Sequence, residues 1–406
     1  MTDKHNMIFY TAIMLFIIYY LQGIVYPSGS FLSQICLITY LLIGICCTFH
    51  SLFLERADAL TYTWGTFALM LSLTFLISPP MVHGTINEAI GDISTFSQFK
   101  ESLSLSLTYF IASHVGRNGT ITDKHLFVFG VFFFLLAFLR FHYTGITLEH
   151  KFDGSVGVTN NAAYCIVVTL PFLVFIWERS KLLAGILMLI STSLIIFSAK
   201  RGAIVCLGAS TILALIYYLR KSKFNPTKHI TAILIVGALG FFAYKSYQSN
   251  EYLMHRVEKT GQVGLGERNI AYTMLFDHWN NEQDPIKFFF GNGTAQTVNI
   301  WGNFAHNDWL ELLIDNGLSG GCIYLALFIL TYIKIYRSEL DFSKKIVCYS
   351  AFIIWLCQSI YSMGYSGFDN AILFLLLGLL PSRDETERYQ EEEEKDYQVL
   401  STKKIL

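Results

Sequence analysis

The feature that most constrains this chain is a succession of apolar stretches, each about as long as a membrane-spanning helix. Such a helix needs about 20 predominantly apolar residues, and short polar joints separate stretches of this kind along most of the 406 residues. Hydrophobic residues make up 53% of the chain and charged residues only 15%, whereas soluble domains carry about 25% charged residues. The sequence therefore predicts an all-α polytopic membrane protein that the bilayer organises.

The apolar stretches predict about twelve transmembrane helices, or about eleven if the serine-rich fourth stretch, Leu103 to Val115, does not cross. They begin near Ile8, Phe31, Tyr62, Leu103, Leu126, Ala162, Leu182, Ala203, His229, Leu318, Ile346 and Ala371. Residues 1–249 would then hold the first nine spans and residues 250–317 one large loop with short helices. Residues 318–381 would hold the last three spans, and residues 382–406 form an acidic tail.

Lysine and arginine in the joints predict the orientation, because cytoplasmic loops hold the excess of these residues. Most of the 29 fall on one side of the bilayer if the amino terminus is cytoplasmic. Both termini are therefore expected in the cytoplasm, and loop 250–317 on the outer side. The formal net charge of −1 excludes a strongly basic surface for nucleic acid, and no nucleic-acid partner is expected. The lipid bilayer is the expected surroundings of the chain.

The large loop has an organisation of its own. Arg268 to Trp279 is predicted to form an amphipathic helix, and Gly291 and Gly293 predict a tight turn. From Ala305 to Gly317 the sequence predicts a short helix with an amino-terminal start signal and a glycine stop.

All eight cysteines lie in apolar stretches, where cysteine behaves as a small hydrophobic residue. We therefore expect no disulfide and no zinc site. The spans carry almost no ionisable side chain away from their ends, which argues against a coupled transporter. A transporter of small anions that uses the outward cations Lys200, Arg201 and Arg268 stays an alternative of another class.

Lys200 and Arg201 lie in the short joint Ser198 to Gly202, on the side where positive residues are depleted. One interpretation is that both side chains extend to lipid phosphates at the interface. The other is a fixed cation pair that binds a pyrophosphate, for which the guanidinium offers two parallel hydrogen bonds and a permanent charge.

Arg268 and His306 each admit two interpretations as well. A cation at a helix start is disfavoured by the helix dipole, so Arg268 either pairs with an acid such as Glu267 or binds a ligand. His306 either fills the turn beside Asn307, which is a good helix N-cap, or acts as a general base near neutral pH.

These motifs together resemble the O-antigen ligase and O-antigen polymerase superfamily of bacterial membrane glycosyltransferases. The resemblance covers about Gly157 to Leu380 and rests on the order of the motifs. They are the Ser198 to Gly202 joint, Arg268, the Gly291 and Gly293 turn and the Ala305 to Asn307 helix start, with Asn160 at the outer end of the sixth span. Lys200 is a departure, since many relatives have serine before the arginine.

The resemblance implies a GT-C-like protein of the bacterial inner membrane with a periplasmic active site. It implies a metal-independent inverting glycosyltransferase without a cofactor, which moves a glycan from an undecaprenyl pyrophosphate-linked oligosaccharide to a sugar hydroxyl. His306 would be the base, Arg201 and Arg268 would stabilise the leaving pyrophosphate, and Lys200, Asn160 and Asn307 would bind substrate. A polymerase that extends the glycan on its carrier is slightly favoured; a ligase that transfers it to lipid A-core is the alternative.

Overall fold

The computed structural model is almost entirely helical in the part of the chain that it describes. This part is residues 2–55, 57–83, 92–149, 162–198, 200–220 and 267–383, with isolated positions between 230 and 248. Within it, β-structure consists of one antiparallel hairpin, in which β1 (Met81–His83) pairs with β2 (Asp92–Ser94), and an isolated bridge. The ninth predicted span and most of the acidic tail lie outside the described residues.

The amino-terminal part contains α1 (Thr2–Tyr20), α2 (Phe31–Phe49), the π-helix η1 (His50–Leu54), α3 (Ala59–Leu76), α4 (Thr95–Asn118) and α5 (Asp123–Glu149). Side chains at the starts of two helices satisfy backbone donors that have no helical partner. Ser30 accepts from the backbone N–H of Ser33, and Asp58 accepts from that of Thr61 at 2.7 Å. These caps place the helix starts close to the predicted ones.

The sixth predicted span is interrupted. It consists of α6 (Ala163–Val167), the 3₁₀ turn η3 (Leu170–Phe172) and α7 (Leu173–Arg179). The expectation of one continuous helix from Ala162 was wrong here, because Pro171 has no backbone N–H to donate and its ring disfavours an α-helix interior. Two longer helices follow, α8 (Lys181–Phe197) and α9 (Arg201–Arg220).

The predicted loop helices are present as α12 (Glu267–Asn280) and the first turns of α15 (Asp308–Arg337). Between them lie α13 (Pro285–Phe290) and α14 (Gln296–Trp301). Gly317 has φ 64° and ψ −164°, so the short helix ends there as predicted, and after this kink α15 continues into the next apolar stretch. The chain then forms α16 (Phe342–Tyr361), the 3₁₀ turn η4 (Phe368–Asn370) and a helix over residues 371–383.

Five described helical segments are long and apolar enough to cross a membrane: Phe31–Leu54, Ala59–Leu76, Asp123–Thr144, Arg201–Arg220 and Asp308–Arg337. Lys181–Phe197 is a shorter apolar helix. Phe31, Leu76 and Leu182 expose more than three quarters of their surface, which suits contact with lipid chains. An all-α membrane protein is thus confirmed, while the number twelve and the outer position of the loop stay predictions.

The serine-rich fourth stretch forms the middle of α4, which packs against α1, α2 and α3. Ser104, Ser106 and Ser113 are fully buried there. Small side chains allow helices to approach closely, and Gly44 of α2 lies where an added Cβ would be 2.6 Å from Leu107 Cβ. The low hydropathy of this stretch therefore reflects a position inside the bundle.

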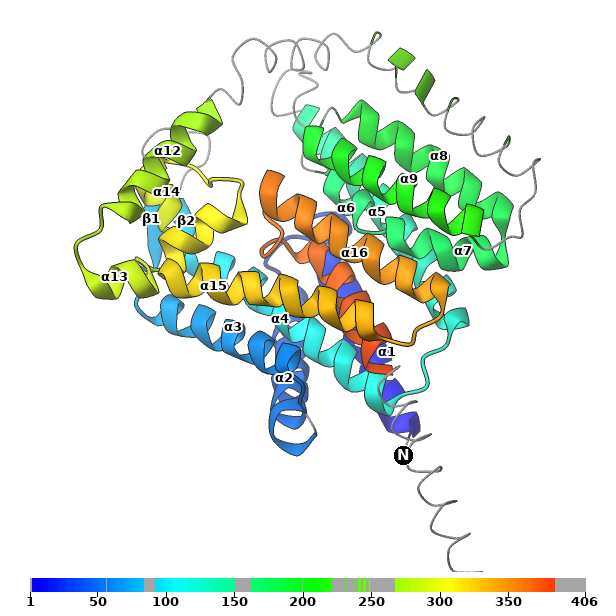
Figure 1. Ribbon diagram of the computed structural model, residues 1–406, viewed down its shortest axis with the longest axis horizontal. Helices are drawn as coiled ribbons and strands as arrows, with labels where there is room; N and C mark the ends of the chain where they lie inside the picture. Colours follow the sequence, from blue (N-terminus) through cyan, green and yellow to red (C-terminus); the bar gives the residue numbers. More distant parts are fainter. Residues whose placement is uncertain are drawn as a thin grey trace, which may run out of the picture.

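Helix α15 runs alongside α3 (Figure 1), and two ion pairs lie near its carboxyl-terminal end. At this end of α15, Lys334 Nζ lies 2.8 Å from Asp58 Oδ2. Glu55 lies three residues before Asp58 in the chain, and its Oε2 lies 2.9 Å from Arg117 Nη1. Both cations belong to the set predicted to face the cytoplasm. The amino-terminal end of α15, which follows His306, lies beyond the kink at Gly317, and the helix from Gly317 to Lys334 alone is about 25 Å long at 1.5 Å per residue.

Candidate functional site

The turn before α15 holds His306 and Asn307. Asn307 caps the helix: its Oδ1 accepts from the backbone N–H groups of Trp309 at 3.0 Å and Leu310 at 3.2 Å. Its Nδ2 donates to the backbone oxygen of Ile360 at 3.2 Å, which ties the turn to the end of α16. The predicted helix start at Asn307 is therefore confirmed.

His306 is held in a left-handed backbone conformation with φ 54°. Such a conformation is uncommon for residues other than glycine, and a buried carboxylate stabilises it here. Glu311, fully buried one turn into α15, accepts from the backbone N–H of Ala305 at 2.5 Å and from the hydroxyl of Thr297. The peptide before His306 is thus anchored to the helix that follows it.

The electrostatic surroundings of His306 bring together three of the residues that the sequence singled out. Burial, followed by the positive charges of Lys200 and Arg268, lowers the pKa of His306 to about 4. Lys200 precedes α9 and Arg268 lies in the first turn of α12, so the three residues come from distant parts of the chain. His306 is consequently a neutral imidazole at neutral pH, beside two cations.

Lys200 also faces an aromatic ring. Its Nζ lies 5.6 Å from the ring centroid of Tyr164 in α6, a distance at which a cation is attracted to the ring face. Gly202 lies on the same tyrosine: an added Cβ would be 2.2 Å from Tyr164 Oη and 3.0 Å from Tyr361 Cβ. This close approach explains why a glycine follows Arg201 in the joint.

Arg201 begins α9 and is partly exposed. The charges that act on His306 are those of Lys200 and Arg268, so the structure couples His306 to Lys200 more directly than to Arg201. The sequence analysis had ranked Arg201 above Lys200 for the chemistry.

Tyr272 joins this group and was not identified from the sequence. It lies one helical turn after Arg268 on α12. Burial raises the pKa of its phenol, whereas the charge of Arg268 and contacts with the side chains of Asn307 and Arg268 oppose the increase. The phenol is therefore a neutral hydrogen-bonding group between these two residues. Its spacing of four residues from Arg268, which places both side chains on one face of a helix, was a signal that could have identified it.

The first part of α15 also carries two further buried carboxylates, Asp308 and Asp315. Asp308 accepts from the Tyr324 hydroxyl at 2.5 Å and from the backbone N–H of Gly364 at 2.8 Å. Asp315 accepts from the backbone N–H groups that open α14, at 2.7 Å and 2.9 Å. With Glu311 they share one face of the helix at intervals of three and four residues, and they fix the loops around His306.

The predicted glycine turn is confirmed. Gly291 has φ 83° and Gly293 has φ 111°, which side chains other than that of glycine rarely allow. An added Cβ at Gly291 would also lie 2.2 Å from the backbone oxygen of Asp315. The turn therefore packs directly on the kink of α15 and sets where α13 and α14 lie.

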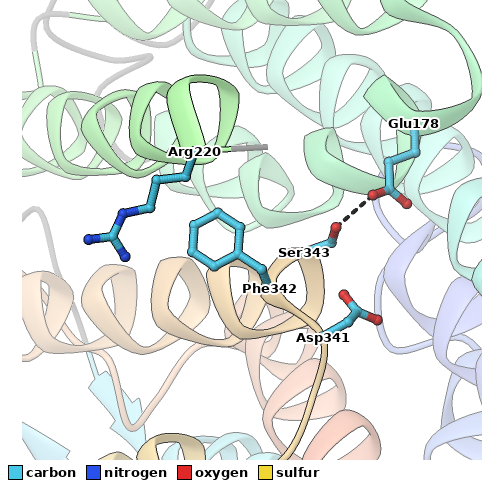
Figure 2. A pocket seen from close by; sticks show the side chains of 5 residues that line it. All are labelled: Glu178, Arg220, Asp341, Phe342 and Ser343. Carbon is cyan, nitrogen blue, oxygen red and sulfur yellow. Dashed lines mark hydrogen bonds between the residues drawn. The ribbon is translucent and has the colours of Figure 1, made fainter. Parts of the chain in front are cut away.

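Asn160, the remaining candidate, lies outside the described residues, as do Gly264 and Gly266. A cavity of about 500 Å³ lies away from His306 (Figure 2). It is lined by Glu178, Arg220, Asp341, Phe342 and Ser343, and the Ser343 hydroxyl donates to Glu178 Oε1 at 2.6 Å. Arg220 ends α9 whereas Arg201 begins it, so this cavity is not part of the candidate site.

Long apolar helices and a cationic, histidine-containing site at the start of α15 define a helical membrane protein with a site suited to an anionic substrate. Residues 186–325 match the family model described as O-antigen ligase. The matched segment contains Lys200, Arg201, Arg268, His306 and Asn307. The match confirms the resemblance to the O-antigen ligase and polymerase superfamily over this segment. A search of curated proteins found no significant match.

Proposed function

We propose that the protein is an inverting membrane glycosyltransferase that moves a glycan from an undecaprenyl pyrophosphate carrier to a sugar hydroxyl, and that it acts as a polymerase. The observation that carries the proposal is the placement of a neutral, partly buried His306 beside Lys200 and Arg268. One group accepts a proton, and the others carry fixed positive charge for a pyrophosphate leaving group.

In the proposed reaction, the acceptor hydroxyl attacks the anomeric carbon from the face opposite the pyrophosphate. The new carbon–oxygen bond forms while the bond to the pyrophosphate oxygen breaks, and the pyrophosphate leaves with the bonding electron pair. The hydroxyl proton passes to His306. A single displacement of this kind inverts the anomeric configuration.

The cations would serve two purposes in this reaction. Lys200, Arg201 and Arg268 stabilise the charge that develops on the pyrophosphate, which gives electrostatic stabilisation without a divalent ion. A bound pyrophosphate also offsets the positive charges that lower the pKa of His306. Donor binding would therefore raise that pKa from about 4 towards its ordinary value of 6.5 and make the imidazole a better base only when there is a donor to react.

The pH dependence follows from this arrangement. The pH dependence of kcat/KM reports the pKa values of the free enzyme. The value of kcat/KM should therefore stay constant as the pH decreases from neutral and should fall as the pH drops through about 4, where His306 gains its proton. In Lys200→Ala the positive charge that lowers this pKa is gone, so the fall should begin at a higher pH. The measurement is kcat/KM against pH, with Lys287→Ala as the control. An unchanged profile in Lys200→Ala would contradict the proposed base.

The proposed orientation places His306 in the periplasm and both termini in the cytoplasm. It is supported by the separation of the charged groups along α15, with Lys334 and Arg117 at the end far from His306. A reporter fused near Gln262 should behave as periplasmic, and one fused after Arg383 as cytoplasmic. The reverse pattern would overturn the orientation and with it the proposed side of the reaction.

The experiment that tests the function uses the purified full chain and a defined polyprenyl pyrophosphate oligosaccharide, with and without lipid A-core. Chain growth on the carrier supports a polymerase, and transfer only to lipid A-core supports the ligase alternative. The reaction is run in EDTA and again with added magnesium or manganese. Equal rates support metal-independent transfer, whereas activity only with an added ion contradicts it. No transfer to either acceptor would contradict the proposed function.

A further inference from the structure

A second cluster of polar side chains lies at the opposite end of α15 from His306. His50 begins the π-helix η1, Glu55 follows that helix, and His114 lies in α4. The Nδ1 atoms of His50 and His114 both lie 3.1 Å from Glu55 Oε1. The three ligand atoms all lie within 4.8 Å of one another.

Hydrogen bonds alone do not satisfy this cluster. A carboxylate oxygen offers about two lone-pair directions, and Asn118 Nδ2 already donates to Glu55 Oε1 at 2.6 Å. One lone-pair direction of Glu55 Oε1 is left for two imidazole nitrogens. His50 Nδ1 is accordingly buried without a hydrogen-bond partner. A buried polar atom left without a partner destabilises the fold. A cation held between the two imidazoles and the carboxylate satisfies all three groups.

The surrounding residues orient the three groups as metal ligands require. His114 Nε2 lies 3.1 Å from His5 Nδ1. If His114 carries its proton on Nε2, it donates to His5, and its Nδ1 lone pair points to the cluster. Arg117 Nη1 donates to the other carboxylate oxygen, Glu55 Oε2, at 2.9 Å. Ligating histidines and carboxylates in proteins are commonly oriented by outer partners of this kind.

We propose that His50, Glu55 and His114 bind a divalent transition-metal ion of the zinc class. Two imidazoles and one carboxylate are a common ligand set for zinc, and bonds of about 2.0 to 2.2 Å place tetrahedral ligands about 3.3 Å apart, close to the observed 3.1 Å. The ring of His50 is 42% exposed, whereas its Nδ1 atom is buried and faces the cluster. The five-residue π-helix at His50 adds support, because single π-turns are frequent at functional sites.

The ion would connect two helical segments that are distant in the chain, α2 with η1 and α4, while His5 extends the cluster to α1. Glu55 lies three residues before Asp58, which pairs with Lys334. The helix from Lys334 back to the kink at Gly317, about 25 Å long at 1.5 Å per residue, therefore separates the metal site from the segment that follows His306. The ion therefore serves as a brace at the far end of the bundle. The proposal is independent of the proposed transferase reaction.

The test measures cobalt or zinc binding by the purified full chain. The chain is purified with an affinity tag that contains no histidine, and it is treated with EDTA, which is then removed before the metal is added. We expect one ion per chain, with the visible absorption of tetrahedral cobalt. His50→Ala removes a half-exposed ligand and leaves the Glu55–Arg117 pair, and it should weaken binding at least roughly tenfold. His5→Phe removes only the outer partner of His114 and should weaken it about 10- to 100-fold.

His278→Ala, which removes an exposed histidine of α12, is the matched control and should bind as the wild type does. Zinc should also raise the thermal unfolding midpoint of the wild type and of His278→Ala, and not that of His50→Ala. If the wild type binds no cobalt or zinc, or if His50→Ala binds it as tightly as the wild type, the cluster is a hydrogen-bonding network only and the metal site is wrong.

Discussion

Replacing His306 is expected to reduce turnover about 10²- to 10⁴-fold, which is the usual contribution of a general base. The loss should appear in the rate of transfer, while donor binding stays largely intact, because the base acts on the proton of the acceptor. The pKa of about 4 leaves the wild-type imidazole neutral and able to accept that proton.

The choice of replacement matters because His306 has φ 54°. An alanine in this left-handed conformation costs about 1 to 2 kcal/mol, which by itself would disturb the turn, whereas asparagine adopts it more readily. His306→Asn therefore separates the loss of the base from backbone strain, and His306→Ala serves as the second variant. Membrane abundance, donor binding and glycan transfer are measured for both, with His278→Ala as the control.

If His306→Asn is as abundant as the wild type and transfers glycan at the rate of His278→Ala, His306 is not the base. The resemblance to the family would stand, because it rests on the match of residues 186–325 and not on the role of one side chain.

Replacing Arg268 or Arg201 with lysine is expected to slow transfer about 10- to 100-fold although the charge is kept. A guanidinium presents two parallel donors to a phosphate and an ammonium does not. One lost hydrogen bond to a charged group amounts to about 1.5 to 3 kcal/mol, and each 1.4 kcal/mol corresponds to a factor of about ten.

Arg268→Lys and Arg268→Gln together distinguish geometry from charge. Both lose the paired donors, but only the glutamine variant removes the charge that lowers the pKa of His306. Transfer should slow in both, and the acid limb of kcat/KM should move to higher pH only in Arg268→Gln. Lys287→Arg, at an exposed position of α13, is the control for the exchange of cations. Wild-type rates in Arg201→Lys and Arg268→Lys would exclude both arginines from the site.

The elements that sequence reasoning identified are those whose cause is local. A run of apolar residues is sufficient to predict a helix in a membrane, because every backbone polar group must be satisfied within the segment. Asn307 caps α15 through its own two following N–H groups, and the Gly291 turn depends on what its own backbone allows. Pro171 was an available signal for the interruption between α6 and α7, and its effect was overlooked.

The features that sequence reasoning missed depend on contacts between distant residues. Tyr272 and the buried face of Asp308, Glu311 and Asp315 had helical spacing, but their partners lie in α14, in the turn before α15, further along α15 and in the loop after α16. The expectation of no zinc site rested on the cysteines in the apolar stretches. The cluster of His50, Glu55 and His114 was not foreseen, because His114 lies 59 residues from Glu55 and no spacing rule connects them.

The sequence by itself determined that this chain is a helical membrane protein, where its main helices begin, and that its unusual cations and His306 lie near helix ends. Hydropathy and capping act within a few residues, so one segment contains the whole cause. Only the tertiary structure decided that Lys200, Arg268 and His306 share one environment and that burial beside two cations makes His306 a neutral imidazole. Desolvation and the Coulomb interaction depend on distance in space, and the packing of α9 on α16 and of α12 on α15 sets that distance.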